Sequence, residues 1–192
     1  MKKLETRYLN ELMKVLLDKE WLKKTKNSPV YYIKRGVKKK NGLRYDITIV
    51  PAKMLGKEFV KTKGHEHKNS YQEFYIVLEG KAIFLTQKGQ GTKIKEAYAI
   101  QAKKGESVII PPFFGHVTIN PSKKDLKIGN WIDENCKNDY KLFEKMKGAC
   151  YYYTQSGWIK NKNYKKVPKL IFKKPSKGTP KNLEFLKKIF NF

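Results

Sequence analysis

The sequence is poor in cysteine and has no long apolar run, and these two absences exclude several protein classes. Cys136 and Cys150 are its only cysteines, too few for a disulfide scaffold and not at the CxxC spacing of a thiolate metal site. We therefore expect both to be free thiols in a reducing cytoplasm. No run of about 18 apolar residues is present, which excludes a transmembrane helix. The first residues lack the apolar centre of a signal peptide.

Acidic residues and arginine are also scarce. The chain has 43 basic and 17 acidic residues and a formal net charge of +26, yet only Arg7, Arg35 and Arg44 are arginine. Proteins that read nucleic-acid sequence use arginine for bidentate contacts with bases, and the lysines here are spread over the whole chain. The charge therefore does not favour a nucleic-acid partner. It predicts instead a positive field that helps to capture a phosphorylated small molecule.

Histidine is scarce too, but its three copies fall in two short motifs. Two stand as His65-x-His67, and because side chains alternate along a strand, these two point the same way. The third, His116, follows a Pro-Pro turn, and Glu73 lies on the strand after His67. Three imidazoles and a carboxylate make a mixed nitrogen and oxygen set, which suits a divalent first-row metal such as iron, manganese, nickel or zinc.

The hydrophobic pattern changes period along the chain and predicts a mostly β protein. Residues 4–22 have apolar side chains at helical spacing, which predicts an amphipathic packing helix. From residue 30 the period is two, and Asn41-Gly42 is a strong hairpin signal. Many short strands separated by glycine and proline indicate a sandwich or a closed barrel. The predicted strands are residues 30–37, 43–50, 57–62, 73–78, 82–86, 94–102, 107–110, 116–119, 126–132 and 150–153.

The pattern divides the chain into three parts. We expect an N-terminal helical segment at residues 1–28, a barrel at 29–160 and a basic C-terminal tail at 161–192. The pattern of residues 138–148 predicts a short helix that ends near Gly148. Residues 183–190 also have apolar side chains at helical spacing. The tail either packs on the barrel or stays loose.

Two stretches of this sequence resemble the two motifs of the cupin family. His65-x-His67, Glu73 and Gly80 resemble the first, and Gly105-Glu106, Ile110-Pro111-Pro112, His116 and Asn120 resemble the second. More narrowly, residues 7–155 are similar to the cupin-type phosphoglucose isomerases of archaea. The segments that carry this resemblance are Gly56-Lys57-Glu58-Phe59, Thr62 to His67, Glu73-x-Tyr75, Pro111 to His116, Asn120 and Asp139-Tyr140.

The resemblance implies a fold, a metal and an activity. It implies a single cupin barrel (a double-stranded β-helix or jelly roll) with an N-terminal helix and short C-terminal helical elements, assembled as a homodimer. It also implies one divalent metal, typically iron, with manganese, nickel or zinc as alternatives, and the interconversion of glucose 6-phosphate and fructose 6-phosphate in glycolysis and gluconeogenesis. The metal ligands by matching position are His65, His67, Glu73 and His116.

The resemblance also assigns substrate-side roles. Thr48, Thr62, Gly64 and Tyr140 match positions that hold the substrate phosphate, and Tyr75 matches an active-site tyrosine. Tyr75 shares a strand face with Glu73, so it lies inside the barrel if Glu73 is a ligand.

Strict alternation would put Thr62 and Gly64 on the face opposite His65. They reach the same site only if the strand bulges or twists, and Gly64 is the place for that. Glu66 lies opposite the two histidines and is left out of the ligand set. We expect Pro111-Pro112 to be a rigid turn that aims His116.

Three positions depart from the family pattern on the substrate side. Ile132 stands where the family has a tyrosine, Asn138 replaces a histidine, and Phe113 replaces an aromatic hydroxyl. The gap between His67 and Glu73 is also one residue shorter. The metal ligands are therefore complete, whereas part of the substrate machinery differs, because an asparagine does not titrate near neutral pH.

Isomerisation moves a proton between C1 and C2, and Glu73 is the candidate base, acting as ligand and base or as base alone. A hydride shift is the competing mechanism, and the residues do not choose between them. Lys57, Lys61 and Lys63 are expected to be solvated charges that add a favourable potential. The alternatives from other classes are a non-catalytic sugar-phosphate-binding cupin, a cupin dioxygenase, and, from charge alone, a nucleic-acid binder.

Overall fold

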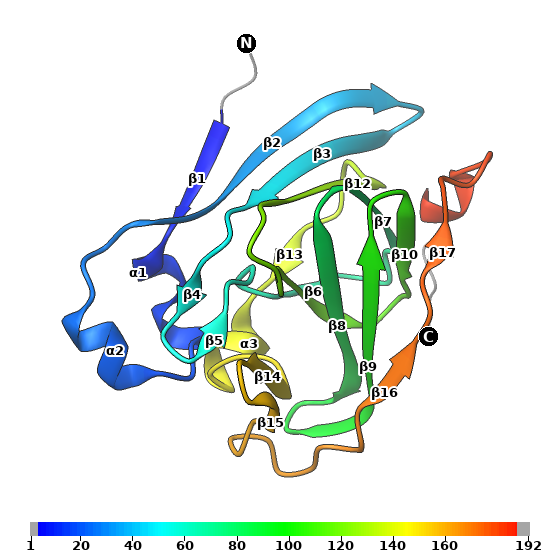
Figure 1. Ribbon diagram of the computed structural model, residues 1–192. Helices are drawn as coiled ribbons and strands as arrows, with labels where there is room; N and C mark the ends of the chain where they lie inside the picture. The colour runs from blue at the N-terminus through cyan, green and yellow to red at the C-terminus, as the bar shows by residue number, and fades with distance from the viewer. Residues whose placement is uncertain (1–3, 188–192) are drawn as a thin grey trace.

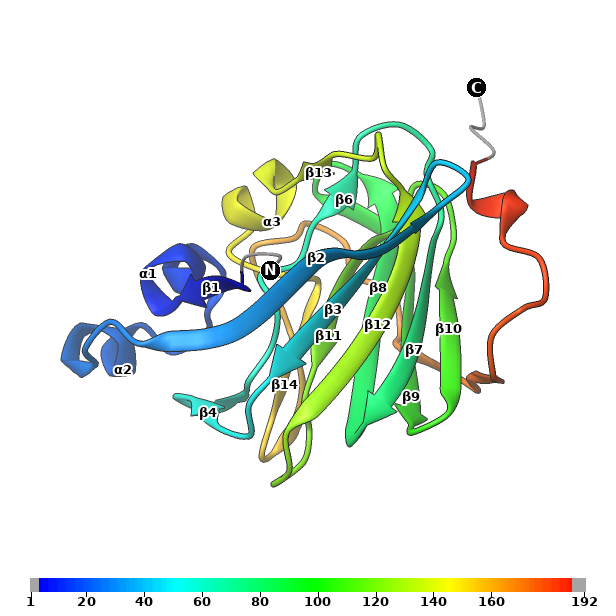
Figure 2. The same cartoon turned by 90° about the horizontal axis from the view of Figure 1, so that it is seen from above.

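The computed structural model describes residues 4–187, and its centre is a barrel of two largely antiparallel sheets that lie face to face (Figures 1 and 2). The larger sheet has seven strands in the order β1 (Leu4–Tyr8), β2 (Pro29–Lys40), β3 (Leu43–Val50), β12 (Leu126–Asp133), β7 (Glu73–Glu79), β10 (Glu106–Ile110) and β17 (Ser176–Lys177). The second sheet has four strands in the order β11 (Gly115–Ile119), β8 (Lys81–Gln90), β9 (Lys93–Lys103) and β16 (Ile171–Lys173).

Small sheets and short helices complete the described part of the chain. The small sheets pair β13 (Asn138–Asp139) with β6 (Glu66–His67), and join β15 (Gly157–Lys160), β14 (Tyr151–Thr154), β5 (Glu58–Phe59) and β4 (Met54–Leu55). The helices are α1 (Leu9–Leu12), α2 (Lys19–Lys24) and α3 (Lys141–Lys145), with 3₁₀ turns η1 (Met13–Val15) and η2 (Glu184–Lys187). None of these described helices is long and apolar enough to cross a membrane.

Period-two patterning explains the barrel. From Tyr45 to Val50 along β3 the partly exposed and buried side chains alternate, so one face of the strand points into the barrel. The hairpin between β2 and β3 forms where Asn41-Gly42 predicts it, and both residues have positive φ, 50° and 73°, as a two-residue primed turn requires. The inner faces of the sheets meet in one apolar core that includes Phe84 and Ile128.

The prediction of one helix over residues 4–22 is wrong. Residues 4–8 form β1, which pairs antiparallel with β2, and the helical part is divided between α1, η1 and α2. Leu9, Leu12 and Leu16 are buried in the core as their spacing indicates, but Asp18 begins a new helix by accepting a hydrogen bond from the Trp21 backbone N–H. The first helical segment ends at Val15, and Asp18 caps the start of a second one in the middle of the apolar stripe.

The other terminal predictions are partly correct. The helix predicted at 138–148 is shorter, because Asn138–Asp139 pairs with β6 and α3 ends at Lys145. The tail packs on the barrel, since β16 runs parallel to β9 and β17 pairs with β10. Leu186 of η2 is buried against Leu43 and Phe74 on the outer face of the larger sheet. The remainder of the helix predicted at 183–190 lies outside the described residues.

Lys61 is buried, which corrects the expectation of a solvated charge. Only 4% of it is exposed, and its ammonium pairs with the carboxylate of Glu58, of which none is exposed. Lys61 Nζ also donates to the Val15 carbonyl at 3.1 Å, and Glu58 Oε2 accepts from the Leu17 backbone N–H at 2.6 Å. The pair therefore fastens the N-terminal segment to the barrel. Lys63 likewise pairs with Glu144 at 2.5 Å.

Candidate metal centre

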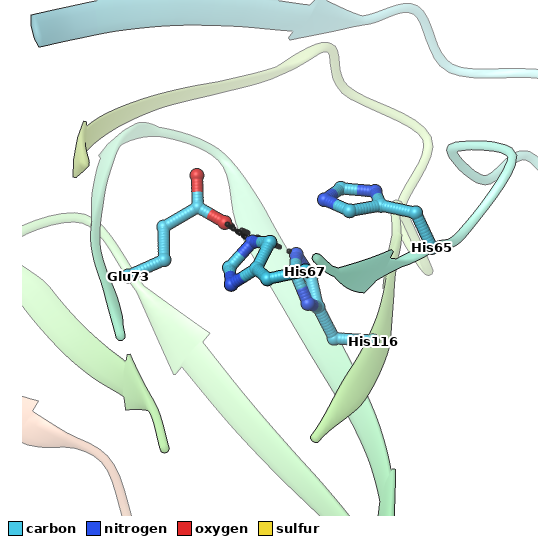
Figure 3. A group of neighbouring side chains, drawn as sticks. All are labelled: His65, His67, Glu73 and His116. Atoms are coloured by element: carbon cyan, nitrogen blue, oxygen red, sulfur yellow. Dashed lines mark hydrogen bonds and ion pairs between the residues drawn. The ribbon is translucent and has the colours of Figure 1, made fainter. Parts of the chain in front are cut away.

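Three imidazoles and one carboxylate converge in the interior of the barrel (Figure 3). His65 precedes β6, His67 lies on β6, Glu73 begins β7 and His116 lies on β11. One ligand atom from each lies within 4.8 Å of the others. Side chains from three segments of the chain thus present four donors to one point, which is the arrangement that a single cation requires.

Backbone pairing holds two of the histidines side by side. His65 and His116 exchange both backbone hydrogen bonds, N–H to O=C at 3.1 and 2.9 Å, and their ring centroids are 4.4 Å apart. The turn before His116 has the form expected of Pro111-Pro112, since the Phe114 N–H donates to the Pro111 carbonyl. The position of His116 is therefore fixed by two backbone features, the paired hydrogen bonds with His65 and the proline turn that precedes it.

Gly64 has the backbone irregularity that the predicted site needs. Its φ is +80°, in the left-handed region that favours glycine. A Cβ at this position would lie 2.4 Å from Val117 Cγ2 and 2.7 Å from Phe143. The kink lets Thr62, Gly64 and His65 line one cavity, although strict alternation would separate them.

Hydrogen bonds outside the cluster fix the orientation of its members. The Tyr71 carbonyl accepts from His67 Nδ1 at 3.0 Å, which leaves Nε2 to face Glu73 Oε2 at 3.1 Å. The other carboxylate oxygen, Oε1, accepts from Asn130 Nδ2 at 2.6 Å. His116 Nε2 lies 3.3 Å from Glu73 Oε2. Partners of this kind set the tautomer and the aim of metal-binding side chains.

Burial and neighbouring charges favour the metal-binding protonation states of two members of the cluster, His65 and Glu73. Burial lowers the pKa of His65 well below its usual value, and the neighbouring imidazoles lower it further, so this ring is neutral. Burial acts to raise the pKa of Glu73, but contacts with His116 and His67 outweigh it and hold that pKa well below normal. The same carboxylate raises the pKa of His67 against the effect of burial. Neutral imidazole and ionised carboxylate are the forms that ligate a divalent ion, so these residues fit such a metal.

The predicted substrate residues line one cavity next to this cluster. Thr48, Thr62, Gly64 and Tyr140 all contribute to its wall, as does Tyr75, whose hydroxyl lies 3.1 Å from His116 Nε2. Thr62 Oγ1 accepts from the Thr118 backbone N–H at 3.0 Å, which leaves its own O–H available to donate.

The three departures from the family pattern do not lie together. Ile132 and Asn138 line the cavity, and Asn138 Nδ2 donates to the Tyr140 hydroxyl at 3.2 Å. Phe113 is not among the described residues that line the cavity, and Lys88 Nζ lies 6.0 Å from the centroid of its ring. Only two of the three changes therefore alter the wall that a substrate would meet.

The sequence reasoning missed several polar residues of the cavity wall. Arg35, Arg44, Asp46 and Asn130 line it, and so does Tyr31, whose pKa burial raises to about 12. All five lie on the inward faces of β2, β3 and β12, where they alternate with residues that point out of the barrel. Arginine is rare in this sequence, and two of its three arginines line the cavity. That rarity was the one signal in the sequence that could have drawn attention to these residues.

A β-barrel whose interior gathers three histidines and a glutamate is a cupin barrel with a candidate metal centre. The family model for "Glucose-6-phosphate isomerase (GPI)" matches residues 6–169. The chain therefore belongs to the glucose-6-phosphate isomerase family, and the match extends beyond residue 155, where the resemblance was expected to end.

Individual relatives agree with this assignment. The chain is 33% identical over 128 residues to a glucose-6-phosphate isomerase of Thermococcus litoralis, covering 64% of this chain and 65% of the relative. It is 36% identical over 120 residues to the Pyrococcus abyssi enzyme of the same name, covering 59% and 61%. The matches thus span less than two thirds of these relatives.

Similarity to solved structures is weaker. A chain of oxalate oxidase gives a TM-score of 0.43 at 14% identity over 53% of this chain and 49% of that chain. The capsular polysaccharide assembling protein CapF of Staphylococcus aureus gives 0.43 at 16% identity over 54% and 26%. The family assignment therefore depends on sequence and not on these superpositions.

Proposed function

We propose that this protein is a metal-dependent isomerase that interconverts glucose 6-phosphate and fructose 6-phosphate. The observation that carries the proposal is the convergence of His65, His67, Glu73 and His116 within 4.8 Å in a chain of the glucose-6-phosphate isomerase family. These four residues would hold one divalent ion, with iron preferred and manganese, nickel or zinc as alternatives. When bound, the ion supplies a Lewis acid that stabilises negative charge developing on the sugar oxygens.

Glu73 is the proposed base. Asn130 holds one of its carboxylate oxygens at 2.6 Å, which fixes the direction in which the other oxygen points. Its lowered pKa keeps the carboxylate ionised at neutral pH, so it is able to accept the proton that moves between C1 and C2. Tyr75 contacts His116 and is proposed to orient that imidazole and to donate a hydrogen bond to the sugar.

The phosphate would serve as a handle that holds the reacting carbons beside Glu73. Thr48, Thr62, Gly64 and Tyr140 are the proposed hydroxyl and backbone donors for it, because they share the cavity with the metal cluster. The protein is further proposed to act as a cytoplasmic homodimer in glycolysis and gluconeogenesis.

The test is a coupled isomerase assay on glucose 6-phosphate under strict anaerobiosis, with metal analysis of the same preparation. We expect turnover that disappears on chelation and returns with Fe²⁺ or Mn²⁺. Glu73→Gln should lose most of this turnover, and Glu79→Gln is its matched control, because Glu79 lies on the same strand, β7, and pairs with Lys127 at the surface. Metal-dependent binding of the sugar phosphate without turnover would identify a non-catalytic binder, and oxygen consumption would identify a dioxygenase.

A further inference from the structure

The cavity beside the metal centre has cationic side chains that are arginine and not lysine. Of the 43 basic residues only three are arginine, yet Arg35 and Arg44 both line this cavity. No lysine of the described residues lines it. In a chain where nearly every surface charge is lysine, two arginines on one interior wall indicate a need for the planar, multidentate guanidinium.

A buried aspartate positions the two arginines. Asp46 is 2% exposed, and its Oδ2 accepts from Arg44 Nε at 3.0 Å and lies 3.4 Å from Arg35 Nη1. Its Oδ1 accepts from the Gly36 backbone N–H at 2.6 Å. Arg35 is further paired with Glu5, which bonds its Nε at 3.0 Å. Arg35 therefore has two carboxylate partners, whereas Arg44 shares only one.

Arg44 has donors left for a ligand. Its Nε is used by Asp46, and within residues 4–187 neither of its terminal nitrogens has a hydrogen-bond partner. A guanidinium has five N–H donors, and its two terminal nitrogens form a fork that matches two oxygens of a phosphate. Asp46 thus holds the Nε of Arg44 in place, while its two terminal nitrogens remain available to a ligand in the cavity.

The strand register places Arg44 close to both the metal centre and Thr48, one of the proposed phosphate-binding residues. Arg44 pairs across the sheet with Ile132, and Ile132 pairs with Glu73, so Arg44 is two strands, about 10 Å, from Glu73. Arg44, Asp46 and Thr48 alternate along one face of β3, and the bond to Asp46 draws the guanidinium along the strand toward Thr48.

The phosphate residues expected from the family resemblance contain no positive charge. Thr48, Thr62, Gly64 and Tyr140 supply only neutral donors, and a phosphate dianion in a partly buried cavity needs a cationic partner. We propose that Arg44 is that partner: it binds the substrate phosphate through its terminal nitrogens and is a specificity-determining residue, with Asp46 as its positioning residue. The proposal rests on the function proposed above, since it names how the same cavity recognises its substrate.

The test compares Arg44→Gln with the wild type on phosphorylated and unphosphorylated sugar. In the metal-loaded protein we expect the KM for glucose 6-phosphate to rise about 10- to 100-fold, the effect of losing a hydrogen bond to a charged group. The rate measured with unphosphorylated glucose as the substrate should change little. Lys39→Gln is the control, because Lys39 pairs with Arg44 across the strands but is bonded to Glu134 at the surface, and we expect it to alter KM less than twofold.

A second measurement separates this proposal from the proposed function. Titration calorimetry with inorganic phosphate is expected to show the same loss of affinity in Arg44→Gln whether or not the wild type isomerises glucose 6-phosphate. If the glutamine variant does not fold, Arg44→Lys keeps the charge beside Asp46 but lacks the fork, and an increase in KM of several fold is expected. The proposal is wrong if a folded, metal-loaded variant binds phosphate as the wild type does, or if KM for glucose rises equally.

Discussion

Replacing Asn130 with leucine tests whether the cavity wall supports the metal centre. The substitution keeps the side-chain size but removes the Nδ2 donor, which lies 2.6 Å from Glu73 Oε1. A hydrogen bond to a charged group contributes about 1.5–3 kcal/mol, and its loss should raise the pKa of Glu73 toward its ordinary value, because the ionised carboxylate loses a donor. Loss of such a supporting contact lowers metal affinity about 10- to 100-fold, and we expect an effect of this size for Mn²⁺ or Zn²⁺ measured by chelator competition at neutral pH.

Asn120→Leu is the matched control for this substitution. Asn120 is as buried as Asn130, but it donates to the backbone carbonyls of Val50 and Lys124 and does not contact the cluster. It should lower the melting temperature without changing the metal affinity of the folded protein. If Asn130→Leu folds and binds metal as tightly as the wild type, the carboxylate of Glu73 does not depend on this contact and the reasoning fails.

Three further predictions concern the ligands and the loop that carries them. His116→Ala should lose metal and isomerase activity together, whereas Glu73→Gln should keep part of its metal by elemental analysis but lose most turnover; full activity in Glu73→Gln would remove that residue from the mechanism. Gly64→Ala should destabilise the fold by about 2–5 kcal/mol, from the positive φ and the collision with Val117, and a calorimetric scan should show a lower melting temperature. In the metal-free protein, the unfolded chain takes up a proton at His65 near its usual pKa of 6.5 while the folded chain does not, so stability should fall as pH drops below about 6.5; His65→Gln should reduce this slope in thermal melts from pH 7 to 5.

The metal cluster could be predicted because its signal is local. His65-x-His67 needs only the alternation of a strand, and the structure places the two rings with His116 as expected. Tyr75 follows from Glu73 by the same rule. The kink at Gly64 was also predictable, since a glycine between two residues that must face one cavity can adopt the positive φ that resolves the conflict.

The positions of Arg35 and Asp46 in the cavity wall could not be predicted from such patterns. Arg35 and Asp46 are brought together by the register between β2 and β3, which shifts between Lys34 and Lys38, and no local pattern specifies that shift. Asn130 meets Glu73 through the pairing of β12 with β7, a contact between residues far apart in the sequence. The first strand was missed for a different reason: its side chains fit helical spacing, and only pairing with β2 makes it a strand.

The buried Glu58–Lys61 pair connects the N-terminal segment of the chain to the strands around the candidate metal centre. The backbone of Lys61 forms an isolated β-bridge with Ile119 on β11, the strand that carries His116. The metal-ligand candidate His65 follows Lys61 by four residues in the sequence. Without residues 9–17, the Val15 carbonyl and Leu17 N–H that satisfy this pair would be missing, and a buried charge that loses partners destabilises its surroundings by several kcal/mol. We therefore expect a chain that lacks residues 9–17 to bind a divalent ion more weakly, although its sequence keeps all four ligands.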